Sequence, residues 1–258
     1  MAGRRTNIKP SIRQARIVEL VSQQNAVTVE HLAADFNISP ETIRRDLSIL
    51  ADAGRIRKVH GGARPAQLQE EGPFDDRMNR NALAKRVIAE KAARLISPGQ
   101  TLFMDTGSTT LICAEVLSKI DNLTIITNSS RIAATFANGS GGARVYLLGG
   151  EYRADNAQSV GAITVEEIGR YNADCAILTI SALDTCGAMD FSHEEAQVAR
   201  AMVGASSRVV VAVDSTKFSQ RTVFNVCELS QIDTLVVDAP PADDELAAAI
   251  AAAEVEVV

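Results

Sequence analysis

Residues 28–63, TVEHLAADFNISPETIRRDLSILADAGRIRKVHGGA, contain two helical patterns in succession, each opened by a capping residue. The Thr28 hydroxyl can accept a hydrogen bond from the first free amides of one helix. Asn37 then interrupts the pattern. Ser39 can cap a second helix, and Pro40 follows at its first position, where the missing N–H does no harm. The stretch therefore predicts two short helices joined by a tight turn.

The second of these helices has an apolar face and a polar face. Its apolar residues recur at i, i+4 and i+7, at Ile43, Leu47 and Leu50. The opposite face carries guanidinium and hydroxyl groups, which can bind guanine edges and phosphate oxygens in a major groove. The residues of this helix that we expect to contact DNA are Thr42, Arg44, Arg45 and Ser48.

A basic segment follows and ends at two glycines, Gly61 and Gly62. Its cations are expected to follow a phosphate backbone, and they are Arg55, Arg57, Lys58 and His60. Together with the two helices, this segment predicts a winged helix-turn-helix. The alternative is a solvated basic face on a small helical domain.

Charge is segregated along the 258-residue chain. Residues 1–64 hold eleven Lys and Arg against six Asp and Glu, a net charge of +5, whereas the remainder holds fifteen against twenty-six, a net charge of −11. This division favours a basic nucleic-acid-binding domain joined to an acidic domain with another task, despite an overall pI near 5.2. We expect a DNA-binding domain over residues 1–64, a linker over residues 65–80 and a second domain over residues 81–258.

The composition also limits the class of protein. Four widely spaced cysteines and the lack of a signal peptide indicate reduced thiols in a cytoplasm rather than a disulfide framework. No apolar run approaches the ~18 residues that a membrane span requires. We therefore expect a cytoplasmic protein with no membrane partner.

The second domain alternates strands and helices. The predicted helix at residues 82–96 has Leu83, Val87, Ala92 and Leu95 on one stripe, and a closing helix is expected near residues 245–253. Short β-prone runs are expected at residues 101–104, 123–127, 143–148, 175–180, 208–213 and 234–237. Strands that are apolar on both faces and separated by helices predict an α/β domain with a mainly parallel sheet.

Several loops that follow these strands carry groups suited to an anion. In open α/β sheets ligands bind beyond the carboxyl ends of the strands. The first loop supplies hydroxyls and helix-start amides, at Asp105, Thr106, Gly107, Ser108, Thr109 and Thr110. Later loops add Thr127, Asn128, Gly150 and Lys217, whose ammonium suits a phosphate, and Asp184, which can accept hydrogen bonds from hydroxyls. The pattern predicts a site for a phosphorylated small molecule, although each loop alone is equally typical of a helix cap or plain turn.

Motifs of nucleotide and metal chemistry are absent. The sequence has no Walker A motif and no dinucleotide-binding glycine pattern, so no cofactor is expected. His193-Glu194-Glu195 is followed by Gln197 where a zinc-protease helix needs its second histidine. No metal site is expected.

These motifs resemble those of the DeoR family of bacterial transcriptional regulators, over about residues 13–238. The family's first pattern stands here as Thr42 to Leu47, Leu50, Gly54, Arg57 and His60 to Ala63. Its second pattern stands as Asp105 to Thr109, Thr127-Asn128, Leu148 to Gly150 and Asp214 to Phe218. The chain departs from the family's glycine-rich segment at Ser181 to Asp184 and Gly187 to Met189.

The resemblance implies a sensor domain with the fold of ribose-5-phosphate isomerase. It also implies a repressor whose affinity for double-stranded operator DNA changes when a phosphorylated sugar or sugar alcohol binds. Because one small head makes few contacts and two-fold sites let contributions combine, we expect a homo-oligomer, a dimer or tetramer, with paired heads. We expect a regulator of a carbohydrate or polyol operon rather than an enzyme. The alternatives are a transcriptional activator of the same kind and a sugar-phosphate isomerase with an accessory DNA-binding head.

Overall fold

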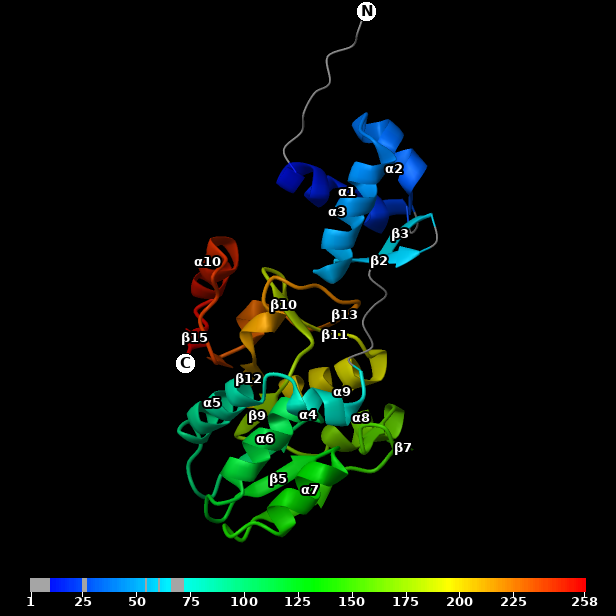
Figure 1. The fold of residues 1–258 in the computed structure, drawn as a ribbon. Coiled ribbons are helices and arrows are strands. Elements are labelled where there is room, and N and C mark those ends of the chain that lie inside the picture. Colours follow the sequence, from blue (N-terminus) through cyan, green and yellow to red (C-terminus); the bar gives the residue numbers. More distant parts are fainter. Residues whose placement is uncertain (1–9, 25–26, 54, 60, 66–71) are drawn as a thin grey trace, which may run out of the picture. The chain divides into compact units, whose positions relative to one another are not determined.

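The computed structural model describes residues 10–24, 27–53, 55–59, 61–65 and 72–258, which form two compact units divided after Glu70 (Figure 1). The first unit contains three helices, α1 (Pro10–Gln24), α2 (Val29–Phe36) and α3 (Pro40–Asp52). Its three-stranded sheet has the order β1-β3-β2, with β1 at Val27–Thr28, β2 at Ile56–Val59 and β3 at Gly62–Pro65. This arrangement confirms the predicted helix-turn-helix with a β-hairpin wing.

Local sequence explains how α2 and α3 begin and end. Thr28 caps α2 by accepting a hydrogen bond from the His31 N–H at 3.1 Å, and Asn37 ends it in the left-handed region with φ 50°. The predicted apolar face of α3 is fully buried, with Ile43 at 0%, Leu47 at 1% and Leu50 at 2% exposure. Helix α3 therefore packs against α1 and α2 through the face that the sequence predicts.

The second unit is built on a seven-stranded sheet in which every pair of neighbours is parallel. In spatial order its strands are β15 (Glu256–Val257), β14 (Thr234–Val237), β12 (Val209–Val213), β9 (Cys175–Leu178), β4 (Thr101–Met104), β5 (Thr124–Thr127) and β6 (Arg144–Leu147). The central strands are buried on both faces, which explains their apolar and β-branched composition. The predicted α/β fold with a parallel sheet is confirmed.

Helices cover both faces of this sheet (Figure 1). The core on one face includes side chains of α5 (Ala82–Ala93), α6 (Ser108–Leu117) and α7 (Ser130–Ala137). The core on the other face includes side chains of α8 (Ala162–Ile168), α9 (His193–Gly204) and α10 (Asp244–Ala252). The predicted closing helix is therefore present as α10.

Smaller elements complete this unit. A second antiparallel sheet has the order β10-β11-β13, and β7 pairs with β8 in a hairpin. The bounds of the small strands are Glu151–Arg153 (β7), Gln158–Val160 (β8), Ala182–Asp184 (β10), Gly187–Asp190 (β11) and Phe224–Cys227 (β13). Two 3-10 turns lie at Ser215–Lys217 and Leu229–Gln231. The sequence did not predict the antiparallel pairs.

The second half of the predicted linker differs in the structure. Residues 66–71 lie outside the described residues, but residues 72–80 belong to the second unit and include α4 (Phe74–Asn79). Phe74 is 4% exposed, and the guanidinium of Arg131 lies 4.1 Å from the centre of its ring. Burial of this aromatic side chain helps to hold the polar segment against the body.

The predicted core stripe of α5 is wrong at Leu83 and Val87, whereas its other two members, Ala92 and Leu95, do pack in the core. Leu83 is 87% exposed and Val87 is 42% exposed, whereas the side chains that face the core belong to Lys85, Ile88, Ala89 and Ala92. A lysine is tolerated inside because its ammonium has hydrogen-bond acceptors there, among them the hydroxyl of Ser108 at 2.9 Å. Helical spacing alone does not reveal those acceptors.

Three of the four cysteines are buried. Cys113, Cys175 and Cys227 lie in the core, and burial raises the pKa values of Cys113 and Cys227 to about 12. Cys186 is exposed at the turn between β10 and β11. All four are free thiols, as the sequence predicts.

Candidate DNA-binding surface and effector site

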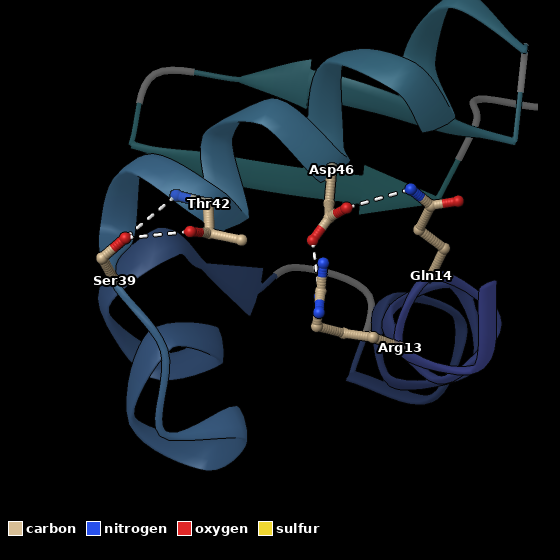
Figure 2. A network of polar contacts seen from close by, with 5 residues as sticks. All are labelled: Arg13, Gln14, Ser39, Thr42 and Asp46. Carbon is tan, nitrogen blue, oxygen red and sulfur yellow. Dashed lines mark hydrogen bonds and ion pairs between the residues drawn. The ribbon is translucent and has the colours of Figure 1, made fainter. Parts of the chain in front are cut away.

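Ser39 caps the amino-terminal end of helix α3. Ser39 Oγ accepts a hydrogen bond from the Thr42 N–H at 3.3 Å and lies 3.0 Å from the Thr42 hydroxyl (Figure 2). Pro40 is the first helical residue, as predicted. Thr42, a predicted DNA contact, therefore lies in the first turn, which is the part of a recognition helix that reaches base edges.

A buried ion pair joins α3 to α1. Arg13 Nε lies 2.7 Å from Asp46 Oδ2, and Gln14 donates to Asp46 Oδ1 at 2.9 Å (Figure 2). Arg13 is 7% exposed and Asp46 is 4% exposed. Sequence reasoning missed this pair, although Asp46 lies on the same helical face as Ile43 and Leu50, and a carboxylate on a buried face requires a partner.

The predicted polar face of α3 is accessible. Arg44 pairs with Glu41 at 2.9 Å, and its side chain is 54% exposed. Arg45 is exposed and has no hydrogen bond or ion pair among the described residues. Ser48 donates to the Arg44 carbonyl at 2.9 Å and accepts from Lys58 Nζ at 3.0 Å. The recognition helix and the wing are thus joined at Ser48 and Lys58.

The wing is an antiparallel hairpin in which Val59 pairs with Gly62. The predicted contacts Arg55, Arg57 and Lys58 are exposed, and His60 lies outside the described residues. Gly62 also pairs with Thr28, and a Cβ at Gly62 would overlap the carbonyl oxygen of Val27. Glycine is required here because the wing approaches β1 so closely.

The second candidate site lies where the strand order of the parallel sheet reverses. From the neighbouring strands β4 and β9, successive strands are added outward in opposite directions, to β6 and to β15. Ligands of open α/β sheets bind beyond the carboxyl ends of the strands at such a point. The Thr179 N–H, just after β9, donates to both carboxylate oxygens of Asp105, just after β4, at 3.1 Å each. This contact joins the two loops.

The predicted Asp105–Thr110 loop forms one buried turn that leads into the first residues of α6. The Thr110 hydroxyl donates to the carbonyls of Asp105 at 3.0 Å and Gly107 at 3.2 Å. Ser108 and Thr109 are 7% and 4% exposed. The first amides of a helix have no intrahelical acceptor, so this turn offers N–H and hydroxyl groups to an anion.

The Asp105 carboxyl has an unusual electrostatic environment. Burial raises its pKa well above the usual value, and the negative charges of Asp190 and Glu195 raise it further, while the Thr179 hydrogen bond opposes them. Sequence reasoning missed Asp190 and Glu195, which lie far away in the chain. Three carboxyl groups close to one another require nearby cations or bound protons to offset their mutual repulsion.

The loop after β5 joins the same site. Asn128 is 1% exposed, and its Oδ1 accepts a hydrogen bond from the Thr106 hydroxyl at 3.2 Å. The Thr127 hydroxyl accepts from the Ser129 N–H at 3.0 Å, so it stabilises the turn itself. Of the two predicted residues, Asn128 is therefore the one in contact with the Asp105–Thr110 loop.

Lys217 lies in the 3-10 turn after β12, which is capped by Asp214, and its side chain is half-buried. Asn81 donates to Asp214 Oδ1 at 3.1 Å, so the start of α5 also contacts this turn. Because β12 neighbours β9, Lys217 follows a strand at the same carboxyl edge of the sheet as Asp105.

Two predicted residues have other contacts. Asp184 pairs with Arg221 Nε at 2.6 Å and accepts from the Cys186 N–H at 2.7 Å, at the tip of the β10–β11 hairpin. Gly150 has φ +136°, and a Cβ there would overlap the Thr164 hydroxyl. Among the described residues, neither shows a hydrogen bond or ion pair to the Asp105–Thr110 loop. Both remain predicted effector-site residues whose described contacts are local.

Two cationic residues near the loop were missed by the sequence reasoning. Lys85 is 4% exposed and donates to Ser108 Oγ at 2.9 Å and to the carbonyl of Arg77, which is itself 8% exposed. A signal was available, since Ile88, Ala89 and Ala92 follow Lys85 at i+3, i+4 and i+7 and form an apolar stripe that begins with the lysine.

Within the described ranges, no group of three or more His, Cys, Asp or Glu side chains could hold a metal ion. No described helix is long and apolar enough to cross a bilayer.

Comparison with protein families gives two matches. Residues 13–68 match the model of the DeoR-like helix-turn-helix domain, and residues 80–239 match that of the DeoR C terminal sensor domain. The two matches coincide with the two sites described above.

Similar proteins include named repressors. The glycerol-3-phosphate regulon repressor of Escherichia coli K12 is 36% identical over 235 residues, which are 91% of this chain and 93% of that protein. The transcriptional repressor AccR of Agrobacterium fabrum is 35% identical over 229 residues, 88% of each chain. Among solved structures, a D-ribose-5-phosphate isomerase in complex with phospho-erythronic acid aligns over 52% of this chain and 52% of its own chain, with 14% identity and a TM-score of 0.39.

Proposed function

Because the chain belongs to the DeoR family of transcriptional regulators, we propose that it is a repressor that binds operator DNA and is released by a phosphorylated sugar or sugar alcohol. The DNA contacts proposed are the accessible groups of α3 and the wing, namely Thr42, Arg44, Arg45, Ser48, Arg55, Arg57 and Lys58, together with His60. Guanidinium and ammonium groups on a helix and a hairpin suit the base edges and phosphates of a duplex.

The buried turn at the switch point of the sheet carries the proposal for the effector. The Asp105–Thr110 loop combines hydroxyls with the amides of a helix start, and Asn128 contacts it. These groups suit a phosphate, and the ammonium of Lys217 supplies the countercharge. The carboxyl oxygens of Asp105, the first residue of the loop, can accept hydrogen bonds from the hydroxyls of a sugar or polyol.

The names of similar proteins suggest which effector to test first. The Escherichia coli relative is a repressor of a glycerol-3-phosphate regulon. Glycerol 3-phosphate is the smallest sugar-alcohol phosphate of the proposed class, and we nominate it ahead of pentose and hexose phosphates.

An oligomer that acts in the bacterial cytoplasm is part of the proposal. One head of this size makes few contacts, whereas two heads related by a two-fold axis can read two half-sites. An effector that binds one arrangement of the heads more tightly shifts the equilibrium, and a typical coupling of ~1–3 kcal/mol changes operator affinity about 5- to 150-fold.

The test joins ligand binding to DNA release. A duplex is first selected from a random library on the purified full-length chain, and its Kd is measured by fluorescence anisotropy. Thermal-shift screening then compares glycerol 3-phosphate, other phosphorylated polyols and sugars, and inorganic phosphate. The proposal predicts that a ligand that raises the Tm also raises the Kd for DNA. No selectable duplex, or ligand binding without release, would contradict it.

A further inference from the structure

Arg77 of α4 lies where two paths of hydrogen bonds from the Asp105–Thr110 loop meet. The shorter path starts at Ser108, whose Oγ accepts from Lys85 Nζ at 2.9 Å. The same ammonium donates to the carbonyl oxygen of Arg77. The loop is thus joined to the backbone of α4 through a single side chain.

The longer path starts two residues earlier, at the Thr106 hydroxyl, and ends at the guanidinium of Arg77. Each step is a hydrogen bond between side chains. Thr106 donates to Asn128 at 3.2 Å, and Asn128 donates to Gln158 at 3.4 Å. Further along, Asn156 donates to Glu195 at 2.9 Å, and Arg77 donates to Asn156 at 2.6 Å. Gln158 also donates to Glu195 and completes the path.

Most of this network is removed from water. Lys85, Asn128 and Gln158 are 4%, 1% and 3% exposed, and Arg77 is 8% exposed. A buried donor that loses its acceptor cannot replace it with solvent, so its neighbours must rearrange. The network therefore favours a small number of discrete arrangements over gradual adjustment.

A phosphate at the loop would change the hydrogen bonds at the origin of the longer path. The Thr106 hydroxyl has one proton, which it now donates to Asn128 Oδ1. If the Thr106 hydroxyl donates to a phosphate oxygen instead, Asn128 Oδ1 no longer accepts a hydrogen bond from Thr106. At the origin of the shorter path, Lys85 can likewise turn from the Ser108 hydroxyl towards the new negative charge.

The other end of the network is the start of the second unit. α4 is the first helix of this unit and follows the DNA-binding unit in the chain. It is held by the buried ring of Phe74, beside which the Arg77 guanidinium lies 5.2 Å from the ring centre. Among the described helices of this unit, α4 is therefore the one nearest in sequence to the head.

We propose that Arg77 is a positioning residue that transmits occupation of the Asp105–Thr110 loop to α4, and so couples effector binding to operator release. This inference rests on the proposed function, since it concerns the regulation of the same site. Arg77 acts through Asn156 and Lys85 and does not itself touch the effector.

The test separates binding from coupling. Arg77→Gln keeps a donor but loses the charge and the forked geometry, and Asn156→Ala interrupts the longer path from a half-buried loop position. For each variant, titration calorimetry gives the Kd of glycerol 3-phosphate, and anisotropy gives the Kd of the selected duplex with and without it. We expect the Kd of glycerol 3-phosphate, and the Kd of the duplex without it, to stay within about threefold of wild type. The ratio of the duplex Kd with glycerol 3-phosphate to the duplex Kd without it should fall towards one.

Two controls exclude a general structural effect. Arg86→Gln removes a guanidinium from the exposed face of α5, where Arg86 pairs with Glu90 at 3.5 Å, and should leave the coupling ratio unchanged. Arg77→Lys keeps the charge and should restore part of the ratio. A thermal melt of each variant checks folding, and Asn156→Ala provides the test if Arg77→Gln does not fold.

Each result has a distinct meaning. Full operator release in both folded variants would overturn the role of Arg77 and leave the proposed function intact. Loss of effector binding in both variants would also overturn it, because Arg77 would then belong to the binding site. If no phosphorylated ligand bound wild-type protein, the proposed function would fail, and this inference would fail with it.

Discussion

Arg13 of α1 and Asp46 of α3 form an ion pair of 2.7 Å that is almost fully removed from solvent. Asp46 is on the inner face of the helix whose outer face carries Arg44 and Arg45. The pair therefore fixes the recognition helix against the rest of its unit at a position between its cap and its end. Removing one member of such a pair is strongly destabilising, because the other charge stays buried without the group that neutralised it.

Asp46→Ala should destabilise the first unit by about 3–5 kcal/mol, since it leaves the Arg13 guanidinium in the core without its carboxylate. Chemical denaturation of the full chain, followed by a probe in the first unit, measures the change. Glu41→Ala is the matched control on the same helix, because Glu41 is 82% exposed in its pair with Arg44 and should contribute less than ~1 kcal/mol. Equal effects would contradict the assigned role of the buried pair.

Arg45→Ala should weaken binding to the selected duplex by about 1–3 kcal/mol if the guanidinium binds a base edge. Arg45 is exposed on α3, so the melting temperature should hardly change. Anisotropy at several salt concentrations gives both the affinity and its salt dependence. Arg170→Ala, which removes an exposed arginine from the second unit, serves as the control. Unchanged DNA affinity in folded Arg45→Ala would remove this residue from the interface.

Lys217→Ala should raise the Kd of the phosphorylated effector at least about tenfold, because a charge-assisted hydrogen bond is worth about 1.5–3 kcal/mol. DNA affinity without effector should be unchanged, since Lys217 lies in the second unit. Lys119→Ala removes an exposed lysine from the same unit and provides the comparison in calorimetry. A variant that still binds and responds like wild type would refute the proposed countercharge.

The Asp105 carboxyl should make stability depend on pH. Its pKa in the folded protein is raised well above the usual 3.8, mainly by burial, so the folded state holds this proton more tightly than the unfolded state. The contribution of Asp105 to stability therefore falls as the pH rises from about 3.8 through its folded pKa. Asp105→Asn cannot ionise, so the free energy of unfolding of the variant should rise relative to wild type over that range. Denaturant melts at several pH values measure the difference, and a constant or opposite trend would contradict the expectation.

Gly62→Ala should destabilise the wing by about 1–3 kcal/mol, the range expected when an added carbon has no room. The new Cβ would overlap the Val27 carbonyl oxygen and push β3 away from β1. Gly204→Ala, at the end of α9, adds the same carbon where nothing lies within 4 Å and should change stability by less than ~0.5 kcal/mol. Thermal melts of the two variants provide the comparison.

Sequence predicts best where local physics decides the structure. The caps at Thr28 and Ser39, the buried face of α3 and the strands of the parallel sheet depend on neighbouring residues or on burial of both faces. Short-range spacing is sufficient for these features. The polar turn at Asp105–Thr110 was likewise found because it follows a strand directly.

Features that depend on distant partners were not predictable in this way. Lys85 can be buried because Ser108 and the Arg77 carbonyl accept hydrogen bonds from its ammonium group. Asp46 can be buried because it forms an ion pair with Arg13. Asp184 was expected at the effector site, and its ion pair with Arg221, far along the chain, was not foreseen. In each case a charge is placed by a partner that spacing along the sequence does not identify.

The positions of the four thiols favour selective labelling of one cysteine for spectroscopy. Cys186 is exposed at a hairpin turn, whereas the other three sulfur atoms lie in the core, where burial raises the pKa of each thiol and so disfavours the reactive thiolate. A maleimide fluorophore should therefore attach selectively at one place in the native, unmodified polypeptide. The dye would sit next to Arg221, where a change in its emission could follow conformational events in real time without any engineered cysteine.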